Sequence, residues 1–407
     1  MRLRTGAAVL LALAVATLGV AGGATVPPSP AGAADDFSAA GPLWYLEAMK
    51  IPPIHDSGIT GEGVTIAVID GAINPAVANL QDADIEIRQL EGCPDPADVE
   101  TTDFEALRHG TSATSLIVGN STADGGAGPA GIAPHAKILY YGLLQEGCEA
   151  RYVDALDDAA AEGADIVTMS GGFLQVNDQL SQEVADSVAE AMRSGVLVVA
   201  ALPNWDSLGT AQLTFINGVI NVAAVDGAAR PLTRLDGTDM TNDDVDVVAP
   251  GVDVAGLGHD GTWGMSTWSG NSAATPIVAG LLALAKQKWP DATASQLTQS
   301  LIRNTGSQPH ELQWSSRLGH GVVNATRLLA EDATQYPDEN PLFKDEQNPS
   351  FDEVYAAPPP TAAPSSSEDS DESLLPWGIA GVVVVIAVIA LVLVVASRKK
   401  TRGRSSV

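Results

Sequence analysis

Between residues 61 and 335, short and almost entirely apolar runs alternate with longer stretches of helical spacing. Continuous apolar runs predict strands that are buried on both faces, because a strand with one wet face would alternate apolar and polar residues. The pattern therefore predicts one α/β domain, with a doubly wound, mostly parallel sheet and helices on both of its faces. The expected strands are 64–69, 137–141, 165–169, 196–200, 219–225 and 245–248, and the expected helices are 151–163, 181–194, 272–288 and 294–304.

The two ends of the chain have compositions of their own. Residues 1–33 carry Arg2 and Arg4, then an apolar run, then small residues at 31–33. This order predicts a secretory signal peptide, and the alternative is an uncleaved anchor helix. Residues 377–396 form an uninterrupted apolar run that is long enough to cross a bilayer, so we expect a transmembrane helix there.

Five basic residues lie in the tail 397–407 that follows this run. Positive charge beside a membrane span predicts a cytoplasmic tail, which places the α/β domain on the extracytoplasmic side of the cell membrane. Residues 34–60 are expected to be a short lead-in rather than a domain. Residues 336–376 are rich in Pro, Ser, Asp and Glu, and we expect a disordered acidic linker because such a segment buries little apolar surface.

The formal net charge of −29 excludes nucleic acid as a partner, since a polyanion is repelled and no basic stripe offsets the repulsion. Two cysteines, Cys93 and Cys148, are too few for a disulfide scaffold. They form one bridge between surface loops if the domain lies in an oxidising compartment, and remain thiols if it lies in the cytosol.

Three polar residues stand where catalytic groups of an α/β domain are found. Asp70 ends the first expected strand, His109 is expected at a helix start, and Ser272 is expected at the amino end of a buried apolar helix. Taken singly, each has an ordinary structural explanation: a turn or helix cap for the Asp and Ser, a surface position for the His. Together they supply the carboxylate, base and hydroxyl of a serine hydrolase, at the edge of the sheet where such groups converge.

The segments around these residues resemble the three motifs of the subtilases, the subtilisin-like serine proteases of peptidase family S8. The segments are 66–71, 108–112 and 270–276, and the order Asp, His, Ser is also that of the family. The resemblance covers roughly residues 60–330. It implies a serine endopeptidase that cleaves proteins or peptides through an acyl-enzyme, with Asp70, His109 and Ser272 as the triad and with no metal or organic cofactor.

Two further segments resemble the same family. Residues 195–204 resemble the strand that ends in the oxyanion-hole asparagine, which implies that role for Asn204. Residues 166–172 resemble the strand that pairs with the substrate backbone, which implies substrate binding by Ser170, Gly171 and Gly172.

The sequence also departs from the family pattern. Gly71 and Ala72 stand in place of a hydroxyl residue and Gly, Ser112 in place of a frequent second His, Asn271 in place of Thr, and Pro203 in place of Gly. The departures at Gly71, Pro203 and Asn271 motivate an alternative: a catalytically weak or inactive subtilase-fold scaffold in a membrane secretion complex. A secreted esterase is a third possibility, which the motif order and the peptide-pairing segment disfavour.

A signal peptide, one carboxyl-terminal span and a short basic tail resemble the mycosins, the subtilases of type VII secretion systems. This resemblance implies a secretion-system membrane complex as partner and a loop-tying Cys93–Cys148 bridge. Subtilases often bind structural calcium, and the acidic loops that contain Asp82, Asp84, Asp243 and Asp244 are the candidates here. These loops lack a recognisable ligand spacing, so we expect a solvated acidic surface instead.

Overall fold

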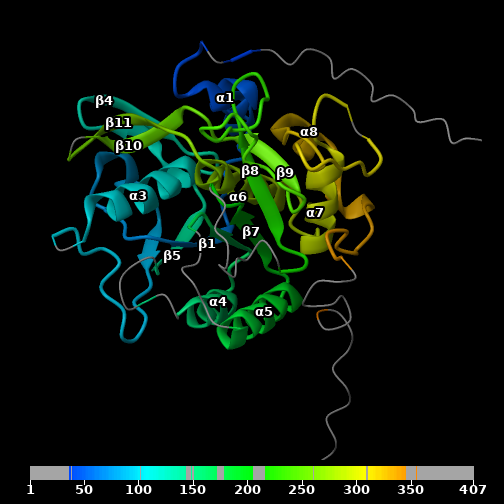
Figure 1. Ribbon diagram of the computed structural model, residues 1–407, viewed down its shortest axis with the longest axis horizontal. Coiled ribbons are helices and arrows are strands. Elements are labelled where there is room, and N and C mark those ends of the chain that lie inside the picture. The colour runs from blue at the N-terminus through cyan, green and yellow to red at the C-terminus, as the bar shows by residue number, and fades with distance from the viewer. Residues whose placement is uncertain are drawn as a thin grey trace, which may run out of the picture. The chain divides into compact units, whose positions relative to one another are not determined.

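Among the residues that the computed structural model describes, seven strands form the central sheet, in the order β2-β5-β1-β6-β7-β8-β9, and every neighbouring pair is parallel (Figure 1). The strands are β1 (Thr65–Asp70), β2 (Ile85–Ile87), β5 (Lys137–Gly142), β6 (Ile166–Met169), β7 (Leu197–Ala201), β8 (Ile220–Val225) and β9 (Val247–Pro250). All six expected strands are present. The seventh, β2, is a half-buried edge strand of three residues, too short to give a pattern in the sequence.

The structure describes residues 36–37, 39–100, 102–143, 148, 151–171, 178–204, 216–259, 261–308, 310–344 and 354. The chain divides into two units, Met1–Ala356 and Ala357–Val407, and the described residues all belong to the first. The expected signal peptide, transmembrane helix and cytoplasmic tail lie outside the described residues. Within the described ranges, no helix combines the length and apolarity that a membrane crossing requires.

Helices cover both faces of the sheet, as expected for a doubly wound domain (Figure 1). On β1, Ile66 and Val68 pack into the core beneath α3 (Phe104–Val118) and α6 (Asn271–Lys288). The alternate residues Ala67 and Ile69 pack on the opposite side, beneath α4 (Tyr152–Ala161) and α5 (Asp178–Arg193). Because both sides of one strand are buried, β1 has the continuous apolar sequence from which it was predicted. The described part of the chain also contains the helices α1 (Trp44–Ala48), α2 (Ile51–Asp56), α7 (Ala294–Arg303) and α8 (Ala325–Ala330), with short 3₁₀ turns at Ala78–Leu80 and Ala333–Gln335.

The strand order gives the sheet a topological switch point at β1. The neighbours of β1 are β5 on one side and β6 on the other, and the chain continues outward from β6 through β9. In open α/β sheets, ligands bind outside the carboxyl ends of the strands at such a point. Asp70 ends β1, Ser170 follows β6 and Asn204 follows β7, so three predicted site residues lie along this edge.

Two antiparallel hairpins were not predicted. The first joins β3 (Asn120–Ala123) to β4 (Gly126–Ala130), and the second joins β10 (Val254–His259) to β11 (Thr262–Trp268). Their strands are rich in small residues and lack the apolar runs that mark the central strands, and β3, β4 and β11 are also partly exposed. The second hairpin leads directly into the start of α6, the helix that carries Ser272.

The lead-in packs firmly on the domain. The Trp44 indole donates a hydrogen bond to the carbonyl of Val252 at 3.1 Å, and the fully buried Tyr45 hydroxyl donates to the carbonyl of Ala130 at 2.6 Å. In the main chain, the N–H of Ala255 donates to the carbonyl of Pro42 at 2.7 Å. The described part of residues 34–60 is therefore built into the core of the domain.

At the other end, ordered packing continues past the expected boundary at residue 335. Asn340 donates to the carbonyl of Gly218 at 3.1 Å, Leu342 is buried, and the N–H of Lys344 donates to the side chain of Asn217 at 2.6 Å. Residues 336–344 thus belong to the domain rather than to the linker. The acidic, Pro-rich composition of 336–376 as a whole gave no sign that these few residues pack on the domain.

Candidate active site

Asp70 is fully buried at the end of β1. Its Oδ1 atom accepts hydrogen bonds from the main-chain N–H of Gly71 and from Nδ1 of His109, both at 2.6 Å. A buried carboxylate is unfavourable without such partners, so the pairing explains how a charge is tolerated at this position. The second carboxylate oxygen, Oδ2, has no partner within the described ranges.

His109 lies in the second turn of α3 rather than at a helix start. The helix begins at Phe104, because the Asp103 side chain accepts hydrogen bonds from the N–H groups of Glu105 and Ala106 and so caps it. Since Nδ1 donates to Asp70, Nε2 of the neutral ring is left as the acceptor that a general base requires. The His109 side chain is 26% exposed.

The pKa of His109 reflects two opposing effects. Burial lowers it, while the charge and hydrogen bond of Asp70 raise it and prevail, so the pKa lies above the ordinary value for histidine. Arg108 acts in the lowering direction and Glu105 in the raising direction. Asp70 therefore favours the protonated imidazole, the form that a general base reaches after it has taken a proton.

Helix α3 packs directly on the turn that follows Asp70. A Cβ atom at Gly71 would lie 2.7 Å from the carbonyl oxygen of Ala106 in that helix. The Tyr140 hydroxyl donates to the carbonyl of Gly71 at 2.9 Å and fixes the same turn from β5. The absence of a hydroxyl residue at position 71 thus follows from the closeness of the helix that carries His109.

Ser272 is the second residue of α6 and is 5% exposed. The first turn of a helix has free N–H groups and a positive dipole end, both of which favour a developing anion. A Cβ atom at Gly270 would lie 3.0 Å from the Ser272 hydroxyl and 3.4 Å from Nδ2 of Asn204. The hydroxyl and the amide therefore border the same small space, which stays open only because residue 270 is glycine.

The amide of Asn204 has a defined orientation. Its Oδ1 atom accepts a hydrogen bond from the main-chain N–H of Asn271 at 2.8 Å. The donor atom Nδ2 is thereby turned toward the space beside Gly270. A donor fixed in this way before substrate arrives is what an oxyanion hole needs.

The other predicted residues are placed as follows. Ser170 is buried at the carboxyl end of β6, and its hydroxyl has no hydrogen-bond partner in the described part of the chain. Gly171 follows it, and Gly172 lies outside the described residues. Ser112, in place of the frequent second His, accepts from the N–H of Leu257 at 2.9 Å and donates to its carbonyl at 3.1 Å, so it ties α3 to β10.

Trp268 is a site residue that sequence reasoning missed. It ends β11 and packs edge to face on the imidazole of His109. A tryptophan four residues before the serine has no distinctive spacing in the sequence. Its contact with His109 therefore could not be predicted and is known only from the structure.

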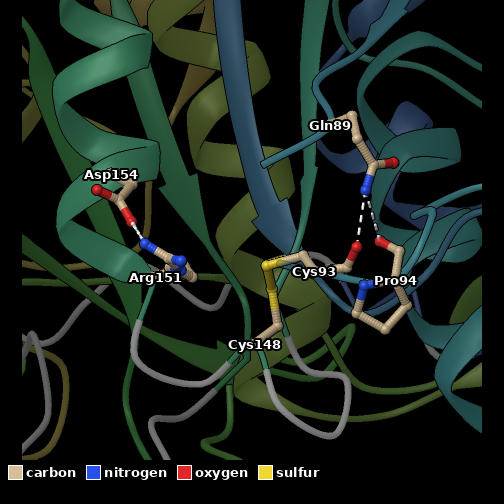
Figure 2. Close-up of a disulfide and its surroundings, with 6 residues drawn as sticks. All are labelled: Gln89, Cys93, Pro94, Cys148, Arg151 and Asp154. Carbon is tan, nitrogen blue, oxygen red and sulfur yellow. Dashed lines mark hydrogen bonds and ion pairs between the residues drawn. A yellow bond between two sulfur atoms is a disulfide. The ribbon is translucent and has the colours of Figure 1, made fainter. Parts of the chain in front are cut away.

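Cys93 and Cys148 form a disulfide, which overturns the free-thiol alternative (Figure 2). The bridge joins the segment after β2 to the segment between β5 and α4. Gln89 donates to the carbonyl of Cys93 at 2.8 Å and supports one side of it (Figure 2).

The acidic loops considered as calcium sites contain carboxylates that contact other side chains. Among the described residues, no group of three or more His, Cys, Asp or Glu side chains is arranged to hold a metal. Asp82 accepts from the side chain of Asn120 at 3.2 Å, and Asp244 lies 3.6 Å from Nζ of Lys344. These carboxylates are engaged with other side chains.

A parallel sheet with a buried Asp–His pair at its carboxyl edge and a serine at a helix amino end defines a serine protease of the subtilisin type. The chain belongs to the subtilase family, whose match covers residues 61–321. Subtilisin BL of Lederbergia lenta is 30% identical over 285 residues, which are 69% of this chain and 96% of that protein. Subtilisin E of Bacillus subtilis is 27% identical over 283 residues, which are 69% of each protein.

Solved structures agree with the fold. The crystal structure of MycP1 from the ESX-1 type VII secretion system has a TM-score of 0.58 at 20% identity, and the match covers 77% of this chain and 90% of that one. Fervidolysin from Fervidobacterium pennivorans, a keratinolytic enzyme related to subtilisin, has a TM-score of 0.57 at 22% identity, with coverage of 76% and 49%.

Proposed function

We propose that this subtilase is a membrane-anchored, extracytoplasmic serine endopeptidase in which Asp70, His109 and Ser272 form the catalytic triad and Asn204 supplies the oxyanion hole. The observation that carries the proposal is the 2.6 Å contact between Nδ1 of His109 and Oδ1 of Asp70. It fixes the tautomer that leaves Nε2 free to take the proton of a serine hydroxyl.

The reaction is an acyl transfer. His109 accepts the proton of Ser272 as the hydroxyl attacks the scissile carbonyl, and Asp70 stabilises the imidazolium that results. The amide of Asn204 and the main-chain N–H of Ser272 hold the oxyanion of the tetrahedral intermediate. His109 then returns the proton to the leaving amine, and water releases the acyl-enzyme in a second attack.

Anchoring in the membrane is supported by the sequence at the carboxyl end. The apolar run 377–396 has the length of a membrane span, and basic residues follow it. The disulfide between Cys93 and Cys148 is typical of an oxidising compartment. Similarity of fold to MycP1 supports a mycosin-like role, in which the chain is associated with a type VII secretion complex.

The inactive-scaffold alternative was motivated by departures from the family pattern, and three of these now have packing roles. Gly71 admits α3, Ser112 ties that helix to β10, and the side chain of Asn271 ties α6 to β8 and to the segment after β7. None of them removes a catalytic group. The departures therefore favour an active protease over an inactive scaffold.

Labelling with a fluorophosphonate probe tests the triad. The purified full-length protein in detergent should be labelled, and Ser272→Ala should not. Ser300→Ala, which alters a fully buried serine of α7, is the matched control and should be labelled like the unmutated protein. No labelling of the folded unmutated protein, or labelling that persists in Ser272→Ala, would contradict the proposal.

The membrane assignment has its own test. The full-length protein should sediment with membranes after alkaline extraction, and a variant that ends at residue 376 should be released. In intact cells, a probe that cannot cross the membrane should label Ser272. Release of the full-length protein, or labelling only after lysis, would overturn the proposed location.

A further inference from the structure

Asn271, the residue before the proposed nucleophile, has a fully buried side chain with partners on three other segments. Its Oδ1 atom accepts from the main-chain N–H of Ala224 in β8 at 2.8 Å. Its Nδ2 atom donates to three main-chain carbonyls: Leu202 at 3.1 Å, Met240 at 3.2 Å and Pro203 at 3.3 Å. One amide thus connects the start of α6 to β8, to the 240 loop and to the segment that leaves β7.

These partners fix the orientation of the Asn271 amide. An N–H group faces one end of it and carbonyl oxygens face the other, so exchanging the oxygen and nitrogen would leave donors against donors and acceptors against acceptors. The two N–H hydrogens are shared among three carbonyls. A threonine side chain, usual at this position in the family, has one hydroxyl and cannot serve four groups in these directions.

The same residue holds Asn204 in two ways. Its side chain bonds to the carbonyl of Pro203, which belongs to the peptide unit immediately before Asn204. Its main-chain N–H bonds to Oδ1 of Asn204 and thereby turns Nδ2 toward the space shared with the Ser272 hydroxyl. Both the backbone and the amide of Asn204 are therefore set by Asn271.

We propose that Asn271 is a positioning residue for the oxyanion donor: its side chain holds the 202–204 segment so that Nδ2 of Asn204 points at the oxyanion. This inference rests on the proposed role of Asn204. The proline ring fixes φ of residue 203, and the Asn271 amide holds the carbonyl of the same residue, so the two departures from the family pattern act at one place.

The rate of fluorophosphonate labelling measures this effect without a known substrate, because the probe forms an anionic oxygen in the same hole. The variants are Asn204→Ala, Asn271→Ala and the double variant in the full-length protein. Asn204→Ala should slow the saturated labelling rate about 10²- to 10³-fold. Asn271→Ala should slow it about 10- to 100-fold, because the Asn204 amide is misplaced. The probe concentration that gives half the maximal rate should change by no more than about twofold. The double variant should be no slower than Asn204→Ala.

Asn79→Ala is the matched control for lost stability. Asn79 is equally buried, and its Nδ2 atom also donates to two main-chain carbonyls, those of Thr122 and Pro129, away from the site. It should lower the melting temperature and leave the labelling rate unchanged. Asn271→Thr is a second variant, whose side chain the family accommodates at this place, and it too should slow labelling because the Pro203 carbonyl loses its donor.

Three results would overturn the inference. The first is a labelling rate in Asn271→Ala and Asn271→Thr that matches Asn79→Ala. The second is a full additional loss when Asn271→Ala is combined with Asn204→Ala, since an effect exerted through Asn204 cannot add to its removal. The third is an unchanged rate in Asn204→Ala, which would also remove the proposed role of Asn204. In the first two cases the triad and the oxyanion proposal stand.

Discussion

The indole of Trp268 meets the imidazole of His109 edge to face, with ring centres 5.1 Å apart and ring planes at 74°. The hydrogen bond that Nδ1 donates to Asp70 fixes one edge of the imidazole, and the indole restricts the rotation that this single bond allows. Trp268 also ends the strand that leads to Ser272. Trp268 thus contacts the proposed base, His109, and also lies just before the proposed nucleophile, Ser272, in the sequence.

Removal of this ring should weaken the site without unfolding it. An edge-to-face aromatic pair is worth about 0.5–1.5 kcal/mol, so Trp268→Ala should slow fluorophosphonate labelling by about 2- to 10-fold. Trp314→Ala, at a tryptophan that is 47% exposed, serves as the control and should leave the rate unchanged. Equal rates in the two variants would show that the indole does not orient His109.

The pH dependence of labelling should report His109. Because Asp70 raises its pKa above the ordinary value, the rate should increase with pH with a midpoint above about 6.5, as the neutral base forms. Asp70→Asn should lower the plateau about 10³- to 10⁴-fold. The effect on stability has the opposite sign: folding favours the protonated ring, so this contribution is present at low pH and is lost as the pH rises through the folded-state pKa. A midpoint below that of free histidine would contradict the Asp70–His109 pairing.

Restoring the family hydroxyl at position 71 should be harmful. In Gly71→Ser, the new Cβ atom would lie 2.7 Å from the carbonyl of Ala106, so α3 would have to move and carry His109 with it. We expect a loss of about 1–3 kcal/mol in the free energy of unfolding, as for other overpacked sites, together with slower labelling. Differential scanning calorimetry and the labelling rate check both. A variant that gains activity would mean that the helix shifts freely.

Asp246 lies at the amino end of β9, opposite the edge that carries the site. We expect its carboxyl group to make the free energy of unfolding depend on pH. Burial raises its pKa from 3.8 to about 7, against the lowering effects of the Asn221 N–H and of Lys344. Folding therefore favours the protonated carboxyl, so stability is lost as the pH rises from about 4 to 7. A shift of three units corresponds to at most about 4 kcal/mol.

Asp246→Asn removes this charge and keeps an acceptor for the N–H of Asn221, which lies 2.8 Å away. The variant should raise the melting temperature at pH 8 and change it little at pH 4. A gain that is the same at both values would show that the carboxyl is not the origin of the pH dependence.

Loss of the disulfide should lower stability and spare the chemistry. The two cysteines are 55 residues apart in the sequence. In the chain-entropy model, a bridge that closes a loop of this length restricts the unfolded chain and raises the free energy of unfolding by about 4 kcal/mol. Cys93→Ser/Cys148→Ser should melt at a lower temperature, while its labelling rate at 25 °C stays close to that of the unmutated protein. A large decrease in the labelling rate of the folded variant would contradict this prediction and show that the disulfide helps to position the catalytic residues.

Much of the fold could be predicted because β1 and its neighbours are buried on both faces and so carry unbroken apolar runs. The three-residue strand β2 and the small-residue hairpins carry no such signal. The expected start of the His109 helix was wrong, because the cap at Asp103 precedes a stretch with little apolar periodicity.

The triad positions were predictable since each stands in a short local motif. The roles of Gly71 and Asn271 were not, because they depend on segments far away in the sequence. Gly71 is explained by the carbonyl of Ala106, and Asn271 by carbonyls at 202, 203 and 240. Departures from a motif can be read as defects until the partner that accommodates them is located in space.

The docking of Trp44 on Val252 joins residues that are 208 positions apart. During synthesis at about 5–20 residues per second, the residue that Trp44 contacts is made about 10–40 seconds after the first helix. The domain therefore cannot close from its amino end as it emerges, and its last contacts form after most of the chain has been made.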